Sequence, residues 1–98
     1  MASGQIRMTP SQMRTRAKEA DKQAQAVGDV ITALDNLLKN LKGEWEGEAL
    51  VGYEQRYNKI KPSFKNAKEL VEEIAANLRT TAKIVEDMDR QIKNQYTK

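Results

Sequence analysis

Residues 42–48 read KGEWEGE and interrupt an otherwise regular pattern of apolar residues near the middle of this 98-residue chain. The stretch holds two of the five glycines and the single tryptophan, Trp45. Glycine is common in turns because, lacking a Cβ, it adopts backbone conformations that other residues avoid. The stretch therefore predicts a turn over residues 43–47, and the fold follows from the segments on either side of it.

The segment before the turn has the periodicity of one long helix. Nine apolar residues follow one another at spacings of four and three, which puts them on one helical face: Met13, Ala17, Ala20, Ala24, Val27, Ile31, Leu34, Leu38 and Leu41. Thr9, Pro10 and Gln12 are typical of a helix start, with Thr9 and Gln12 as a capping box. Gly43 is expected to end the helix in the left-handed conformation. The pattern predicts a helix over about residues 10–42.

The segment after the turn has the same periodicity over a greater length. Twelve of the fourteen positions in its row are apolar: Leu50, Tyr53, Tyr57, Ile60, Phe64, Ala67, Val71, Ile74, Leu78, Thr81, Val85, Met88, Ile92 and Gln95. Glu46 and Glu48 favour a helix start. Pro62 removes one backbone hydrogen bond, so we expect a bend near residues 58–61 without a break in the helix. The row predicts a helix over about residues 48–95.

These elements predict an all-α fold, a long antiparallel helical hairpin forming one domain over residues 1–98. The chain is short enough for a single domain, and five residues of connection allow only an antiparallel arrangement. The helices are unequal in length. The segment after about Thr81 is therefore expected to project past the first helix.

A second apolar stripe on the first helix predicts a dimer. Ala26, Val30, Ala33 and Leu37 lie beside the first row, so the apolar face is too wide for one neighbouring helix. We expect two hairpins to form a four-helix bundle, most simply a homodimer, with Val30, Ala33, Leu37 and Leu41 at the interface. A monomeric hairpin with an unusually apolar surface is the alternative.

The position of Trp45 fits either arrangement. In a dimer the ring can be covered by the neighbouring chain at the end of the bundle. In a monomer it can fold back and close the end of its own hairpin. Both interpretations remain open from the residues alone.

Composition excludes several classes of function. The chain has no cysteine and no histidine, which removes disulfides, thiol nucleophiles, Ser-His arrangements and the usual zinc ligands. We therefore expect no enzymatic activity, no catalytic residue, no metal and no cofactor. A net charge of +3 comes from basic and acidic residues that are interleaved, without stacking aromatic residues, so we expect no nucleic-acid partner. No segment has the length of a membrane span or a signal-peptide core, and the heptad faces are better explained by packing than by membrane insertion.

A Trp-x-Gly motif between two heptad helices, in a chain of about a hundred residues, resembles the WXG family of small ESAT-like (Esx-type) bacterial proteins. The motif is Trp45 and Gly47. A second motif of the family, in the C-terminal tail, is matched by residues spaced by four, three and four: Val85, Asp89, Ile92 and Tyr96. Val85 stands where the mycobacterial motif has a tyrosine, so the chain is similar to the Firmicutes form. Without the resemblance, this row also fits the last turns of an ordinary amphipathic helix.

The resemblance implies a function in type VII (ESX) secretion. Members are exported as folded dimers without a cleaved signal peptide, after synthesis in the bacterial cytoplasm, and act as effectors or co-secretion factors through protein-protein contacts. The turn and the tail are thought to form a two-part signal read by the secretion ATPase. A dimeric helical adaptor or chaperone that delivers another effector is the alternative, as is a heterodimer with a related WXG protein.

Overall fold

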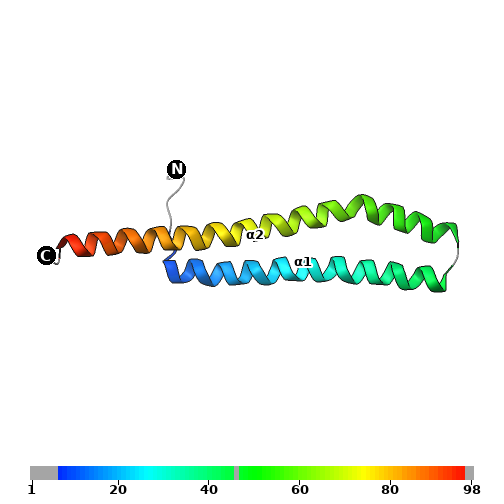
Figure 1. Cartoon of the computed structure of the whole chain (residues 1–98), viewed down its shortest axis with the longest axis horizontal. Coiled ribbons are helices and arrows are strands. Elements are labelled where there is room, and N and C mark those ends of the chain that lie inside the picture. The colour runs from blue at the N-terminus through cyan, green and yellow to red at the C-terminus, as the bar shows by residue number, and fades with distance from the viewer. Residues whose placement is uncertain (1–6, 46, 97–98) are drawn as a thin grey trace.

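The computed structural model describes residues 7–45 and 47–96, which form two antiparallel helices and no strand (Figure 1). Helix α1 spans Pro10–Glu44 and helix α2 spans Glu48–Tyr96. They lie side by side in a molecule measuring 77 × 28 × 14 Å. The predicted all-α hairpin is confirmed, and its two ends are separated by the length of the helices.

The start of α1 has the predicted capping box. The Gln12 amide donates to Thr9 Oγ1 at 3.1 Å, and the Thr9 amide donates to Gln12 Oε1 at 2.9 Å. Pro10 occupies the first helical position, where its missing N–H leaves no bond unmade.

The end of α1 differs from the prediction at Gly43. The helix continues to Glu44, and Gly43 is helical with no left-handed backbone. Trp45 is the capping residue, with extended backbone and its amide donating to the Leu41 carbonyl oxygen at 2.7 Å. The expectation for Gly43 was wrong because an extended tryptophan, and not a left-handed glycine, turns the chain out of the helix.

Helix α2 runs through Pro62 without a break, and Figure 1 shows it arching away from α1 in its green part, where the bend was expected. The proline ring clashes with the preceding turn and removes one hydrogen bond, while the apolar row continues on both sides. Glu48 lies in the first turn of α2, where its charge is favourable. Glu46 lies outside the described residues.

The face of α1 that packs on α2 is the predicted row. Five of its nine residues are buried and the other four are half-buried. The tightest part of the core is built from alanines, with Ala17, Ala20 and Ala75 in contact and Val71 and Leu78 packed around them. Small side chains allow the helices to approach closely along this stretch.

The predicted row of α2 divides into two faces. One set of alternate members is buried or half-buried and packs toward α1: Leu50, Tyr57, Phe64, Val71, Leu78 and Val85. The other set is mostly exposed, including Tyr53, Ile60, Ile74 and Met88. Ala75 and Ala82 are not part of the predicted row, yet both are almost fully buried. The contact with α1 is thus rotated away from the centre of the apolar stripe, which leaves apolar surface on a second side.

The overhang of α2 begins later than predicted. Thr81 is half-buried, Ala82 is buried, and Arg14 forms an ion pair with Glu86. The overhang therefore starts beyond Glu86, a few residues after the predicted position of about Thr81. The last turns of α2 still extend past the start of α1.

A polar cluster joins the helices near the bend. The Tyr57 hydroxyl donates to Asp35 Oδ1 at 2.8 Å, and Lys61 Nζ lies 3.1 Å from both carboxylate oxygens of Asp35. The hydrogen bond from Tyr57, followed by that from Lys61, lowers the pKa of Asp35 below its usual value of 3.8. Burial and the nearby carboxylate raise the pKa of Tyr57 to about 12. The cluster therefore holds a charged carboxylate and a neutral tyrosine at neutral pH.

The lowered pKa of Asp35 predicts a loss of stability in acid. A folded-state pKa below the unfolded value gives stability that is present above about pH 4 and lost as pH falls through the folded pKa. The free energy of unfolding, measured by urea titration at pH 7 and pH 3, is expected to fall less with acid in Asp35→Asn than in the native chain. Asp29→Asn, an exposed position on the same helix, is the control. An unchanged acid dependence in Asp35→Asn would contradict this role.

Candidate functional site: the turn, the tail and the outward face

The turn carries a partly covered tryptophan. The Trp45 ring lies 6.2 Å from the Tyr53 ring, centroid to centroid, with an interplanar angle of 53°. This separation and tilt are typical of favourable aromatic pairs. Trp45 is nevertheless 42% exposed. Its own hairpin covers the ring only in part, and the remaining surface is open to another protein.

Gly47 is exposed, and its described surroundings do not require a glycine. Its backbone is not left-handed, and a Cβ added there would lie 3.8 Å from Trp45 Nε1, an ordinary contact distance. The packing of this chain thus leaves room for a side chain at position 47. Because glycine has no side chain, nothing projects from position 47 beside the indole of Trp45.

The tail residues share one face of the last turns of α2. Val85 is half-buried, whereas Asp89 and Ile92 are exposed. Tyr96 is the last residue of α2, and its side chain lies outside the described part of the structure. The spacing of four, three and four brings these positions into line along the helix. The row continues beyond the ion pair of Arg14 with Glu86, onto the end of α2 that extends past the start of α1 (Figure 1).

The turn and the tail lie at opposite ends of the hairpin (Figure 1). Trp45 and Asp89 of one chain are therefore separated by most of a 77 Å long molecule. The structure does not bring these two predicted site residues together within one chain.

One side of the hairpin is apolar and exposed, and we call it the outward face: Val30, Leu37, Tyr53, Ile60 and Ile74. Each of these side chains is between 40% and 54% exposed. A groove of about 280 Å³ runs along this face, lined by Leu34, Leu37, Leu38, Tyr53, Arg56, Tyr57, Ile60 and Phe64. A second apolar groove, of about 330 Å³, lies further along beside Ile74 and Met13.

The predicted interface overlaps this face. Val30, Ala33 and Leu37 are exposed in the single chain, and Leu41 is half-buried. Sequence analysis placed Tyr53, Ile60 and Ile74 in the main row of the second helix and did not separate them from the members of that row that face α1. The signal that could have separated them is the width of the apolar stripe on α2. A wide stripe was noticed on the first helix but not on the second.

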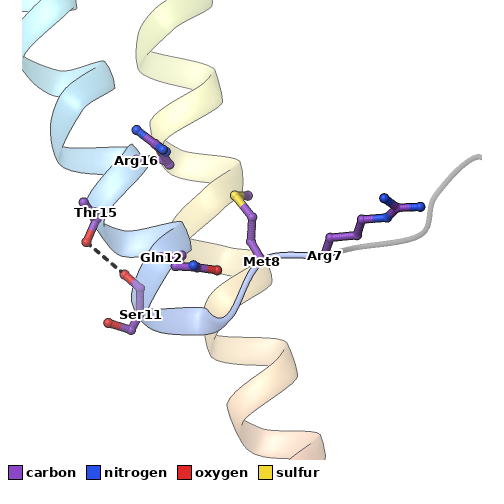
Figure 2. Close-up of a pocket in the computed structure, with 6 residues that line it drawn as sticks. All are labelled: Arg7, Met8, Ser11, Gln12, Thr15 and Arg16. Atoms are coloured by element: carbon purple, nitrogen blue, oxygen red, sulfur yellow. Dashed lines mark hydrogen bonds between the residues drawn. The ribbon is translucent and has the colours of Figure 1, made fainter.

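A polar hollow of about 370 Å³ at the start of α1 does not form a ligand site. Its lining is drawn in Figure 2: Arg7, Met8, Ser11, Gln12, Thr15 and Arg16. Thr15 Oγ1 donates to the Ser11 carbonyl oxygen at 3.1 Å, and Arg16 pairs with Glu19. The Arg7 and Arg16 side chains point in different directions (Figure 2), so their charges do not converge.

The described residues contain neither a metal-binding cluster nor a candidate membrane span. Among them, no three His, Cys, Asp or Glu side chains gather closely enough to hold a metal ion. Over the same part of the chain, neither helix is long and apolar enough to cross a membrane.

Comparison with known proteins gives consistent matches over nearly the whole chain. The family model described as proteins of 100 residues with WXG matches residues 5–90. Protein YukE of Bacillus subtilis is 32% identical over 93 residues, covering 95% of this chain and 96% of that protein. The type VII secretion system extracellular protein A of Staphylococcus aureus is 24% identical over 91 residues, covering 93% and 94%.

Solved structures have the same fold. EsxA of Geobacillus thermodenitrificans has a TM-score of 0.85 and 34% identity, covering 92% of this chain and 97% of that chain. The secreted protein EsxB of Bacillus anthracis, as an E54Q variant, has a TM-score of 0.78 at 20% identity, covering 91% and 99%. The second similarity concerns the fold alone.

Proposed function

The chain belongs to the WXG100 family, and we propose from this and from its geometry that it is a substrate of a type VII secretion system, exported as a folded dimer. A relative that is itself named an extracellular protein of such a system supports this proposal. In the proposed role the chain leaves the cytoplasm without a cleaved signal peptide. It then acts as an effector or a co-secretion factor through contacts with other proteins.

The observation that carries the proposal is the separation of the turn motif and the tail motif, which lie at opposite ends of one hairpin, with Trp45 and Asp89 both exposed. If a second hairpin lies antiparallel to the first, the turn of each chain comes beside the tail of the other. Trp45 of one chain and Asp89 of its partner then form one surface. We propose that the secretion ATPase reads this combined surface.

The outward face supports the dimer on which the combined surface depends. Burying a large aliphatic or aromatic side chain contributes about 1.5–3 kcal/mol, and the outward face leaves five such side chains about half exposed in one chain. Exposed apolar patches of this kind commonly mark protein interfaces. We place Val30, Ala33, Leu37 and Leu41 at this interface, together with Tyr53, Ile60 and Ile74.

An adaptor that delivers another effector is a second candidate, supported by the same outward face. A related hairpin of different sequence can cover this face as well as a second copy can. The two candidates differ in the behaviour of the purified chain. A stable dimer of the chain alone favours the homodimeric substrate, and folding only after a related hairpin is added favours the adaptor.

Export is tested in a bacterium that carries a type VII secretion system. The chain is expected in the culture supernatant when the secretion ATPase is active and only in the cell pellet when its ATP-hydrolysing residues are substituted. The intact mass of the secreted chain is expected to equal that of the cytoplasmic chain, because no peptide is removed. Secretion that continues with an inactive ATPase would overturn the proposed route.

A further inference from the structure

We propose that Tyr53 is a positioning residue, which holds the Trp45 ring in the orientation that the secretion machinery reads. This inference rests on the proposed function, since it assigns a new residue to the turn half of the export signal. Tyr53 lies outside the Trp-x-Gly tripeptide, in α2, more than one helical turn after its first residue, Glu48.

The first observation is the contact between the two rings. The ring centroids are 6.2 Å apart and the ring planes are tilted by 53°. Aromatic pairs in this geometry are favourable beyond the area that they bury. Tyr53 is the aromatic partner that the structure records for Trp45, and the interaction spans the turn from α1 to α2.

The second observation is that Trp45 is only partly covered by its own hairpin. It has extended backbone after the last turn of α1, and 42% of the residue is exposed. Gly47 contributes no side chain beside it. A large, half-exposed ring of this kind has several rotamers open to it, so a neighbouring ring on a rigid helix selects among them.

The third observation is that Tyr53 also lines the groove of the outward face. Leu37 and Ile60 border the same groove. A second chain that covers the outward face therefore contacts the ring that holds Trp45. Tyr53 thus links the proposed dimer interface to the turn, and the recognised orientation of the indole is favoured where the dimer forms.

Two substitutions of Tyr53 distinguish the effect of its aromatic ring from the effect of its apolar volume. Tyr53→Leu keeps an apolar side chain on the outward face but removes the aromatic partner, whereas Tyr53→Phe keeps the ring. Val51→Ala is a further control, because Val51 is an exposed apolar residue of the same part of α2 that points to the opposite side. Sedimentation of each variant verifies that the dimer is present before its other properties are compared.

The first readout is the fluorescence and near-ultraviolet circular dichroism of Trp45, which is the only tryptophan in the chain. Tyr53→Leu is expected to shift the emission to longer wavelength and to weaken the tryptophan dichroism, because the smaller Leu side chain no longer pairs with the indole and leaves it in contact with more water. Tyr53→Phe and Val51→Ala are expected to keep the native spectra. Native spectra in Tyr53→Leu, or the same shift in Tyr53→Phe, would overturn the proposed role of the ring.

The second readout is export. An aromatic pair of ordinary strength changes the population of the held orientation by about two- to tenfold, so secretion of Tyr53→Leu is expected to fall by a similar factor. Secretion of Tyr53→Phe is expected at the native level. The inference would be overturned if Tyr53→Leu were secreted at the native level in an assay where Trp45→Ala stays in the cell. Native secretion of Trp45→Ala would instead overturn the turn signal itself, while the spectra still decide whether Tyr53 holds the ring.

Discussion

Substituting Trp45 by alanine is expected to remove the chain from the culture supernatant while a dimer remains in the producing cell. The exposed part of the indole is available to the secretion machinery, and loss of a tryptophan at the centre of a contact typically costs at least about 2 kcal/mol of binding. That cost corresponds to about a thirtyfold fall in affinity. Asp89→Ala is expected to have the same effect, because Asp89 is the exposed acidic residue of the tail row.

Neither substitution removes a residue from the core of the hairpin. Trp45 lies after the last residue of α1, and Asp89 is exposed on the last turns of α2. Changes at exposed positions such as Asp89 usually alter the free energy of unfolding by less than about 0.5 kcal/mol. Trp45→Ala has the larger effect on stability if the partner covers the ring, about a few kcal/mol at most.

The measurement compares the amount of each variant in the supernatant and in the cell pellet, with circular dichroism and sedimentation of the same purified proteins. Asp87→Ala is the control for Asp89, because Asp87 lies two residues away on another side of α2 and pairs with Arg90. Native levels of both Trp45→Ala and Asp89→Ala in the supernatant would show that the turn and the tail are not export signals.

Replacing Val30 and Leu37 together by glutamate is expected to give monomers with reduced helicity. Both side chains are about half exposed in one chain, and each buries its remaining apolar surface only if a second chain is present. The four side chains of a symmetric dimer then lose about 3–6 kcal/mol of apolar burial, half of the full value because each is already half covered. Like charges forced into the interface add to this loss. Dimer affinity is expected to fall at least about a hundredfold.

A matched control places the same two charges on the far side of the same segment. Thr32→Glu with Asn36→Glu alters exposed positions of α1 that do not belong to the outward face. This variant is expected to keep the dimer mass in sedimentation, and the Val30 and Leu37 variant to lose it. An unchanged dimer in the latter would place the interface on another surface of the hairpin.

The sequence was most informative about α1, because all nine residues of its predicted main row are buried or half-buried in the structure. In α2 two adjacent rows are apolar, and periodicity alone does not decide which of them packs inward. The tertiary contact rotates α2 so that Ala75 and Ala82 are buried and Ile60 and Ile74 remain outside. Small alanines, which permit close approach, are easily overlooked beside larger apolar residues.

In the turn, too, local sequence preferences do not decide the structure by themselves. Glycine at position 43 indicated a helix end, but the local preference was overridden by two more helical residues and an extended Trp45. The pairing of Trp45 with Tyr53 depends on the relative placement of two helices across the turn. No pattern in the sequence fixes that placement. The motif residues could therefore be named from the sequence, whereas the residue that contacts the indole required the structure.

The central claim is that one export signal is built from the turn of one chain and the tail of its partner. It is tested most directly by co-expressing Trp45→Ala and Asp89→Ala chains that carry different tags. A mixed dimer then has one end with both substitutions and one end with a native turn beside a native tail. A dimer of the native chain with a Trp45→Ala, Asp89→Ala double variant has no such end.

The two single variants, each retained in the cell when expressed alone, are expected to appear together and in equal amounts in the supernatant. The double variant is expected to stay in the cell even when the native chain is present. The reverse result would contradict the account: single variants that do not restore each other, and a double variant that is exported with the native chain, would show that each chain carries its whole signal by itself.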